Sequence, residues 1–304
     1  VYPAANRRDY HDRLVRPYET ARRYSLPPEP DVFAIPGNHD WYDSLVSFTR
    51  LFCSQRWFQG WRTRQHRSYF ALQLPHRWWL VGTDFQLGSD IDALQVTYFK
   101  EVAARMQPGD RIILCCAEPH WVYEEAYQDL DPEMNENNLR YLEKVFAKAG
   151  AHTWVHLAGD LHHYRRHAHP DGTQKITAGG GGAFLHPTHG TDVSSLAGGF
   201  AQQVAYPSVP QSAAMAWRNL LFPAINPKFG WVTGLTYAMA GWWWQSGGLG
   251  MVLGPLLIVA GFITFTDTHS TWYKRIGGTL HAAAHLLAAA GLAYGARALV
   301  TAAG

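Results

Sequence analysis

The chain has 304 residues, enough for two domains, and 47% of them are hydrophobic, so there is ample material for a packed core. Only 16% are charged, which is below the quarter typical of soluble domains, so part of the chain is not expected to be ordinary soluble surface. A formal net charge of +2 argues against a nucleic-acid-binding protein of the strongly basic kind. The 16 histidines are many for this length, and histidine is the commonest metal ligand.

The first elements predicted along the chain are a helix and three strands. Residues 1–30 are polar and rich in arginine, which favours a solvated helix followed by a loop. Residues 31–35 are expected to form a short buried strand that Pro36 and Gly37 end. Two further strands at 68–74 and 78–82 are expected to form a hairpin.

Helices and strands alternate after this hairpin. Apolar residues recur four apart in the segment 92–106, which predicts a helix there. The remaining predictions are a strand at 111–116, a helix at 135–149, a strand at 153–158 and a strand at 175–178. This alternation indicates an α/β layered domain, and the hairpin indicates a mixed sheet.

The sharpest chemical signal is the run Gly37-Asn38-His39-Asp40, directly after a predicted strand. Asn38 offers a neutral carbonyl oxygen to a metal ion, and His39 can donate a proton or neutralise phosphoryl charge. Glycine lets the backbone turn sharply beside such a site. The same residues also suit a loop in which Asn38 and Asp40 cap a helix that begins near Trp41.

A second cluster, residues 159–163, reads Gly-Asp-Leu-His-His and also follows a predicted strand directly. Side chains two residues apart on an extended segment point the same way, so Asp160 and His162 can share one binding site. The alternative is an ordinary surface turn. The run 179–189, which begins with four glycines and contains His186 and His189, is either a pocket rim or a flexible loop.

These two clusters resemble the calcineurin-like metallophosphoesterase family. That family has five blocks in order: Asp-x-His, Gly-Asp, Gly-Asn-His-Asp/Glu, a lone His, and Gly-His-x-His. The third block is intact here, and the resemblance implies that Asn38 binds a metal ion, that His39 is the catalytic group facing the phosphate and that Asp40 orients it. The fifth block is altered, with Asp160 in the first His position and His162 in the second, and Asp remains an acceptable metal ligand.

The fourth block also departs from the family pattern. After the strand 111–116 the family has His-x-Pro, whereas Ala117 stands in the His position and cannot bind a metal. Glu118 or His120 could substitute. Together with His163, they are expected either to bind a metal or to lie beside the pocket.

The first two blocks are absent, and residues 1–3 resemble the sequence that follows the Gly-Asp block. Their ligands are therefore expected to lie before residue 1, and residues 1–304 alone are expected to be inactive. The resemblance implies a layered α/β sandwich with mixed sheets in residues 1–200. It implies two divalent ions (Mn, Fe or Zn) and hydrolysis of a phosphomonoester or phosphodiester by a metal-activated hydroxide. The alternative is a membrane-tethered degenerate member that serves as a binding or scaffold protein.

The composition changes after a linker expected at 201–228. Residues 229–304 are expected to form a hydrophobic helical tail associated with a membrane. Uncharged stretches at 229–245 and 249–266 are the stronger candidates, and 279–300 is weaker because Arg297 and two histidines interrupt it. The flanking cations place the catalytic domain in the cytoplasm by the positive-inside tendency; they are Arg218, Lys228, Lys274 and Arg275. A hydrophobic helical subdomain and interfacial helices are the alternatives.

Overall fold

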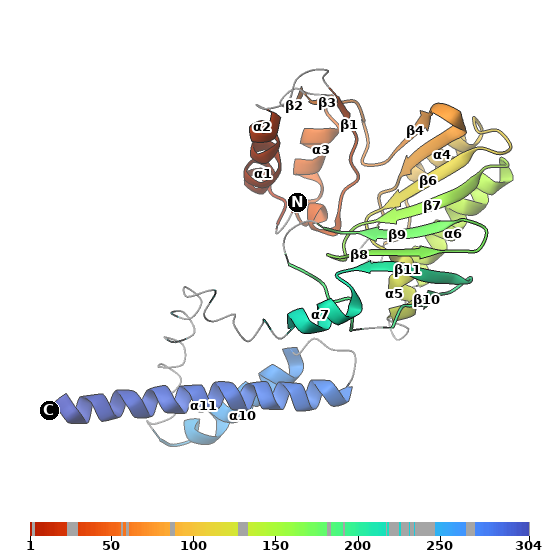
Figure 1. Ribbon diagram of the computed structural model, residues 1–304. Coiled ribbons are helices and arrows are strands. Elements are labelled where there is room, and N and C mark those ends of the chain that lie inside the picture. The colour runs from red at the N-terminus through yellow and green to blue at the C-terminus, as the bar shows by residue number, and fades with distance from the viewer. Residues whose placement is uncertain are drawn as a thin grey trace. The chain divides into compact units, whose positions relative to one another are not determined.

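The computed structural model describes residues 1, 4–22, 30–55, 57–58, 61–85, 89–126, 133–180, 184–190, 192–216, 218, 225, 231, 234, 247–265 and 271–303. The chain divides into two compact units, Val1–Ala216 and Trp217–Gly304. The first unit is α/β and the described part of the second is helical (Figure 1).

A mixed sheet of eight strands forms the centre of the first unit (Figure 1). The strand order is β10-β11-β8-β9-β7-β6-β5-β4. Neighbours β5, β6, β7 and β9 run parallel, and every other pairing in the sheet is antiparallel. The strands are β4 (Phe70–Leu74), β5 (Trp78–Gly82), β6 (Arg111–Cys116), β7 (His152–Ala158), β8 (Tyr164–Ala168), β9 (Gln174–Ala178), β10 (Ser195–Leu196) and β11 (Phe200–Tyr206).

This sheet confirms the α/β class, the mixed pairing and the five strands predicted between residues 68 and 178. Strands β8, β10 and β11 were not predicted. The first unit also runs past the expected domain end at 200, because β11 pairs with β8 and helix α7 (Val209–Ala216) follows it.

Helices α4 (Ala93–Ala103), α5 (His120–Ala126) and α6 (Glu133–Lys148) form a layer against the sheet (Figure 1). Helix α4 begins at Asp92, whose carboxylate accepts the backbone N–H groups of Leu94 and Gln95. Phe99, Leu142 and Phe146 from these helices are fully buried against Leu114 and other strand residues. The predicted helices 92–106 and 135–149 are therefore confirmed, while α5 was not predicted.

The residues before β4 form a smaller layer of helices and a mixed three-stranded sheet. The order is β1-β3-β2, with β1 parallel to β3 and β2 antiparallel to it. The elements are α1 (Arg7–Tyr10), a π-helical turn (His11–Val15), α2 (Arg16–Arg22), β1 (Asp31–Val32), a 3-10 helix (Asn38–Asp43), α3 (Val46–Phe52), β2 (Trp57–Phe58) and β3 (Trp61–Thr63).

Two predictions for this smaller layer need correction. The strand expected at 31–35 is only two residues long, because both backbone polar groups of Ala34 bond to the Gln65 side chain, at 2.7 and 2.9 Å. The first helix is not wholly solvated. Tyr10 is 4% exposed and packs with Phe48 and Phe52 in a second hydrophobic cluster.

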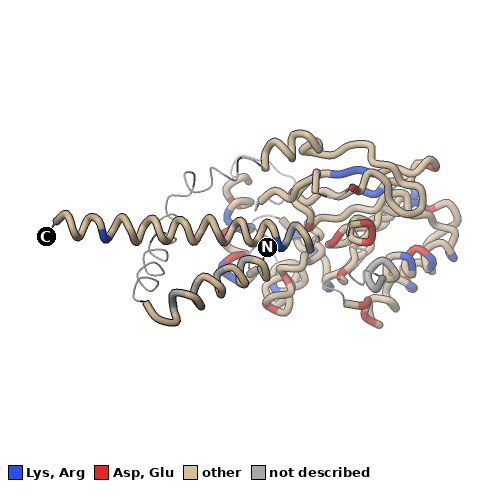
Figure 2. Tube along the Cα trace, turned by 90° about the horizontal axis from the view of Figure 1, so that it is seen from below, with Lys and Arg blue, Asp and Glu red and all other residues tan. Residues whose placement is uncertain are grey.

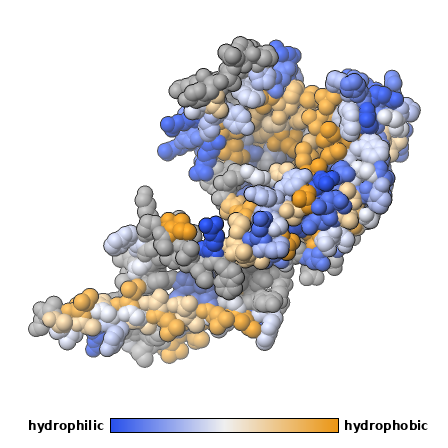
Figure 3. Space-filling view, in the orientation of Figure 1, coloured by the Kyte–Doolittle hydropathy of each residue, from blue (hydrophilic) through white to orange (hydrophobic). Residues whose placement is uncertain are grey.

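The second unit contains two long described helices, α10 (Gly250–Phe265) and α11 (Thr271–Ala303), which pack against each other. Within the described residues, α11 has one segment, Arg275–Ala302, that is long and apolar enough to cross a membrane, judged by length and composition. Its apolar surface is largely exposed (Figure 3). This segment contains the stretch 279–300, which was predicted to be the weakest of the three candidate membrane segments. Helix α10 lies in the stronger candidate 249–266 but is only 16 residues long. Most of the stretch 229–245, including its three consecutive tryptophans, lies outside the described residues.

The packing of α6 on the sheet predicts a large stability effect for Phe146→Ala. Phe146 is fully buried and its ring meets that of Phe99 edge-on at 6.2 Å, so truncation leaves a cavity. We expect the free energy of unfolding of the first unit to fall by about 3–5 kcal/mol, measured by urea unfolding. The matched control is Leu94→Ala on α4, which is 77% exposed and should change it by less than about 0.5 kcal/mol. Equal effects of the two variants would contradict this packing.

Candidate functional site

The candidate site lies where the parallel strands of the large sheet end. Parallel strands bring their carboxyl ends to one edge of a sheet, and in open α/β sheets ligands bind outside that edge. Four segments reach this edge: Asp84 after β5, Glu118 and His120 after β6, Asp160 and His162 after β7, and Gly179 after β9.

A direct contact joins the two motifs found in the sequence. The Asn38 Nδ2 donates a hydrogen bond of 2.9 Å to the Asp160 Oδ1, across 122 positions of sequence. The Asn38 Oδ1 accepts the backbone N–H of His39 at 2.8 Å. The other carboxylate oxygen of Asp160 accepts a hydrogen bond from the Tyr123 hydroxyl. The two motifs therefore meet as predicted, but not at the ends of neighbouring strands, because β1 ends at Val32 in the smaller sheet and β7 belongs to the large one.

The turn that carries Asp160 is sterically constrained. Asp160 itself has a φ of 60°, in the left-handed region that residues other than glycine seldom adopt. Across from it, a Cβ added to Gly179 would lie 2.0 Å from the Leu161 carbonyl oxygen. The end of β9 can approach this turn only because position 179 has no side chain.

The buried Asp40 carboxylate holds the loop of residues 37–40 in place through hydrogen bonds. This carboxylate is 6% exposed and accepts hydrogen bonds from the Gly37 N–H at 2.9 Å and the Tyr10 hydroxyl at 2.7 Å. Burial, and then the Asp40 carboxylate, raise the pKa of Tyr10 far above its ordinary value, so its hydroxyl stays a donor.

The helix-capping interpretation of this motif is correct in part, because Asp40 accepts the Gly37 N–H where the 3-10 helix Asn38–Asp43 begins. The hydrogen bonds of Asp40 described above orient the loop as a whole.

The His39 ring meets Tyr42 edge-on, with centroids 4.8 Å apart.

His162 is paired with a second histidine from the glycine-rich run. The His162 N–H donates to the His186 Nδ1 at 2.9 Å, and the two rings stack with centroids 4.7 Å apart. Phe184 lies against the His162 ring at 4.6 Å. The His162 Nδ1 has no hydrogen-bond partner in the part of the chain that the structure describes. Phe184 and His186 of the glycine-rich run therefore lie against His162.

The three other candidate residues lie beside this centre and are buried. Glu118 and His120 precede and begin α5, and the His120 ring stacks on Phe85 at 5.7 Å. Burial lowers the pKa of His120 to about 4, and burial followed by the charge of Arg165 lowers that of His163 to about 4. Both imidazoles are therefore neutral near pH 7, as a metal ligand or a hydrogen-bond acceptor must be.

Sequence reasoning missed Asp84, which connects the loop of the first motif to β5. The Trp41 Nε1 donates to the Asp84 Oδ1 at 3.1 Å, and Gln95 bonds to both backbone polar groups of Asp84 at 2.8 Å. Burial raises the pKa of Asp84 to about 6, although hydrogen bonds from Ser68 and Trp41 lower it. The signal was present, because Asp84 follows a buried strand just as Asp160 does.

Metal-binding capacity is limited among the described residues. No three His, Cys, Asp or Glu side chains there gather closely enough to hold a metal ion.

The chain matches no model of a known protein family. A search of curated proteins also gives no match.

The pKa of Asp84 predicts a pH dependence of stability. Between pH 4 and 6 the folded state keeps a proton that the unfolded state has lost, so stability falls as pH rises through this window. A raised pKa of this size corresponds to about 3 kcal/mol. We expect Asp84→Asn to remove this decline, so the variant gains about 3 kcal/mol relative to wild type between pH 4 and 7 in urea unfolding. Carbon-13 NMR should place the titration midpoint of Asp84 near 6; a midpoint near 4 would contradict the prediction.

Proposed function

We propose that the first unit is a metal-dependent phosphoester hydrolase of the calcineurin-like metallophosphoesterase kind. The observation that carries the proposal is the hydrogen bond from Asn38 to Asp160, because it joins a Gly-Asn-His-Asp run to a Gly-Asp-x-His run at one point. The position of that contact at the carboxyl edge of parallel strands gives further support, since this is where open α/β sheets bind ligands.

The two motifs contain ligand types that a divalent ion accepts. Asp160 supplies a carboxylate, His162 an imidazole whose Nδ1 has no partner among the described residues, and Asn38 an amide oxygen. Mn, Fe and Zn accept this mixture of oxygen and nitrogen ligands. Each of the two ions needs ligands beyond this set, because no group of three His, Cys, Asp or Glu forms in the described part of the chain. When bound, such ions polarise phosphoryl oxygens and lower the pKa of bound water.

The chain's own residues supply positioning and proton transfer. His39 follows Asn38 directly and packs on Tyr42, so it would face a phosphoryl group held at Asn38 and donate a proton to the leaving oxygen. Asp40, anchored by Tyr10, fixes the loop that presents both residues. The His186 Nδ1, which accepts the His162 N–H, keeps the turn after β7 in place.

A second candidate function is a membrane-tethered protein that uses the same site for binding or scaffolding. Both carboxylate oxygens of Asp160 already accept hydrogen bonds, from Asn38 and Tyr123. Metal binding would have to displace at least one of them. This observation favours a site that binds phosphate esters without turning them over.

His39→Ala and Asp160→Asn separate these two functions. The variants are made in the native protein. His39→Ala should lower kcat/KM for an aryl phosphate ester with Mn²⁺ by about 10²-fold or more, and it should leave the affinity for Mn²⁺ unchanged. Asp160→Asn should weaken Mn²⁺ binding, measured by electron paramagnetic resonance. The control, His66→Ala, removes an exposed imidazole bonded to Gln55 and should alter neither quantity. Mn²⁺ binding without any turnover in the wild type would favour the binding function.

The C-terminal unit supports a proposal of membrane association. Residues 276–296 of α11 are 21 residues without Asp, Glu, Lys or Arg. At ~1.5 Å per residue they span about 31 Å, close to a hydrocarbon core of ~30 Å. Figure 2 shows basic positions only near the two ends of this helix. Arg275 and Arg297 would then lie at opposite interfaces, so Arg297 is not near the middle of the span.

The charge distribution also gives an orientation. Lys274 and Arg275 lie at the N-terminal end of the span and Arg297 at the other end, and Arg218 and Lys228 precede both. By the positive-inside tendency the N-terminal end, with the first unit, would face the cytoplasm.

Two leucines of α11 provide a test with a matched control. Leu287, near the middle of the span, and Leu299, beyond Arg297, are each 74% exposed. An arginine at the bilayer centre costs ~2.5–3.5 kcal/mol on insertion scales. We therefore expect Leu287→Arg to shift the protein toward the soluble fraction in cell fractionation, and Leu299→Arg to leave it with the membranes. Recovery of the wild type in the soluble fraction without detergent would contradict membrane association. Cleavage of the first unit by protease added to intact cells would contradict the orientation.

A further inference from the structure

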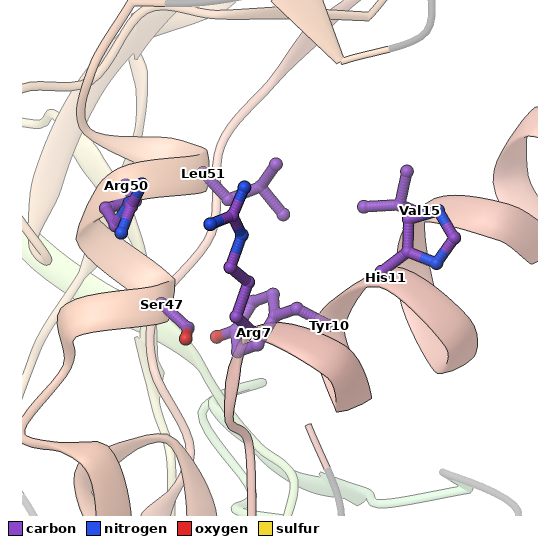
Figure 4. Close-up of a pocket in the computed structure, with 7 residues that line it drawn as sticks. All are labelled: Arg7, Tyr10, His11, Val15, Ser47, Arg50 and Leu51. Carbon is purple, nitrogen blue, oxygen red and sulfur yellow. The ribbon is translucent and has the colours of Figure 1, made fainter.

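A pocket of 220 Å³ lies between the first helices and α3, away from the Asn38–Asp160 contact. Figure 4 shows Arg7 between α3, which carries Ser47, Arg50 and Leu51, and the π-helical turn that carries His11. Two arginines, a histidine and two hydroxyl groups line it, together with aliphatic side chains. No carboxylate is among the described residues that line it, and Arg7 and Arg50 carry its positive charge.

The two arginines of this pocket are unpaired in the described part of the chain, whereas its other polar residues contact carboxylates. Arg7 and Arg50 form no ion pair within the described residues. Asp12 contacts the His11 Nδ1 at 2.9 Å, and Asp43 accepts the backbone N–H of Ser47 at 3.1 Å. Guanidinium groups are the donors that proteins commonly use to bind phosphate oxygens.

The size of the pocket restricts the ligand. Pockets for drug-sized ligands measure ~300–1,000 Å³, so this one suits a small group and not a whole nucleotide. A phosphate group meets both requirements, because it is small and offers several acceptor oxygens to the two arginines.

Tyr10 connects the pocket to the candidate site. Its ring lines the pocket, and its hydroxyl donates to the Asp40 Oδ1 at 2.7 Å, next to His39 in sequence. Helix α3, which carries Ser47 and Arg50, follows the Asn38–Asp43 helix after only two residues. A group bound in the pocket is therefore held on the same framework as His39.

We propose that this pocket binds a second phosphate group of the substrate, so that the enzyme acts on phosphoesters that carry another phosphate. The prediction that the pocket binds phosphate depends only on Arg7 and Arg50. The assignment of that phosphate to the substrate rests on the proposed hydrolase function.

Phosphate binding tests the pocket by itself. The full chain in neutral detergent, with a chelator present so that no metal ion takes part, is titrated with inorganic phosphate by calorimetry. Arg7→Gln and Arg50→Gln should each weaken binding about tenfold, because each removes a charge-assisted hydrogen bond. Arg13→Gln removes the same charge from the same helical segment outside the pocket and should leave binding unchanged. Equal loss in all three variants, or loss in none, would overturn the pocket.

Substrate preference tests the link to function. Two phosphate esters of one alcohol are compared, one of which carries a second phosphate, and the preference is the ratio of their kcat/KM values. Arg7→Gln and Arg50→Gln should each lower the preference for the bisphosphorylated ester about tenfold. Arg13→Gln should leave it unchanged. Phosphate binding in the pocket without turnover of either ester would contradict the hydrolase and leave the pocket intact. Turnover with an unchanged preference in both pocket variants would overturn the substrate assignment and leave the hydrolase intact.

Discussion

The parallel pairing of β5, β6, β7 and β9 is the constraint on which the rest of the first unit depends. Their registers are nearly level at the carboxyl end: Gly82 pairs with Cys115, Cys116 with Ala158, and Ala158 with Thr177. Hydrogen bonds of this ladder fix where each strand stops, so the residues that follow emerge at a common edge. Segments separated by tens of residues in sequence meet there, and any chemistry at that edge depends on the ladder.

The smaller N-terminal layer contributes the other half of the site and is attached differently. Its Gly-Asn-His-Asp loop reaches the sheet through polar contacts, from Asn38 to Asp160 and from Trp41 to Asp84. Beneath the loop, the buried Asp40 carboxylate accepts hydrogen bonds from the Tyr10 hydroxyl and the Gly37 N–H. Buried polar groups hold one geometry well because every lost bond leaves an unsatisfied group. Side-chain hydrogen bonds therefore position this half of the site, whereas the backbone ladder and the packed core of the large sheet position the other half.

The sequence predicted the elements whose burial follows hydrophobicity. Strands β5 and β6 and helix α4 are examples, because their buried positions are mostly apolar. Strand β8 was missed because its buried positions hold Arg165 and His167, which reverses the usual pattern. The contact of Asn38 with Asp160 was predicted, although the strand expected before Asn38 is short and lies in the smaller sheet. The role of Tyr10 could not be predicted, because it depends on a helix that packs on a distant loop. Asp84 could have been found by the rule that found Asp160.

The closeness of Gly179 to Leu161 has a consequence for how variation in this chain should be interpreted. The obstacle at position 179 is a backbone oxygen, which no rotamer change can move aside, and it opposes alanine as firmly as any larger residue. A saturation mutagenesis survey scored by activity would therefore rank Gly179 beside Asp160, although glycine brings no functional group to the site. Under the proposed function, intolerance at the two positions has different origins, a steric clash at Gly179 and a lost carboxylate at Asp160. Only variants that conserve shape, such as Asp160→Asn, distinguish a residue that reacts from one that leaves room.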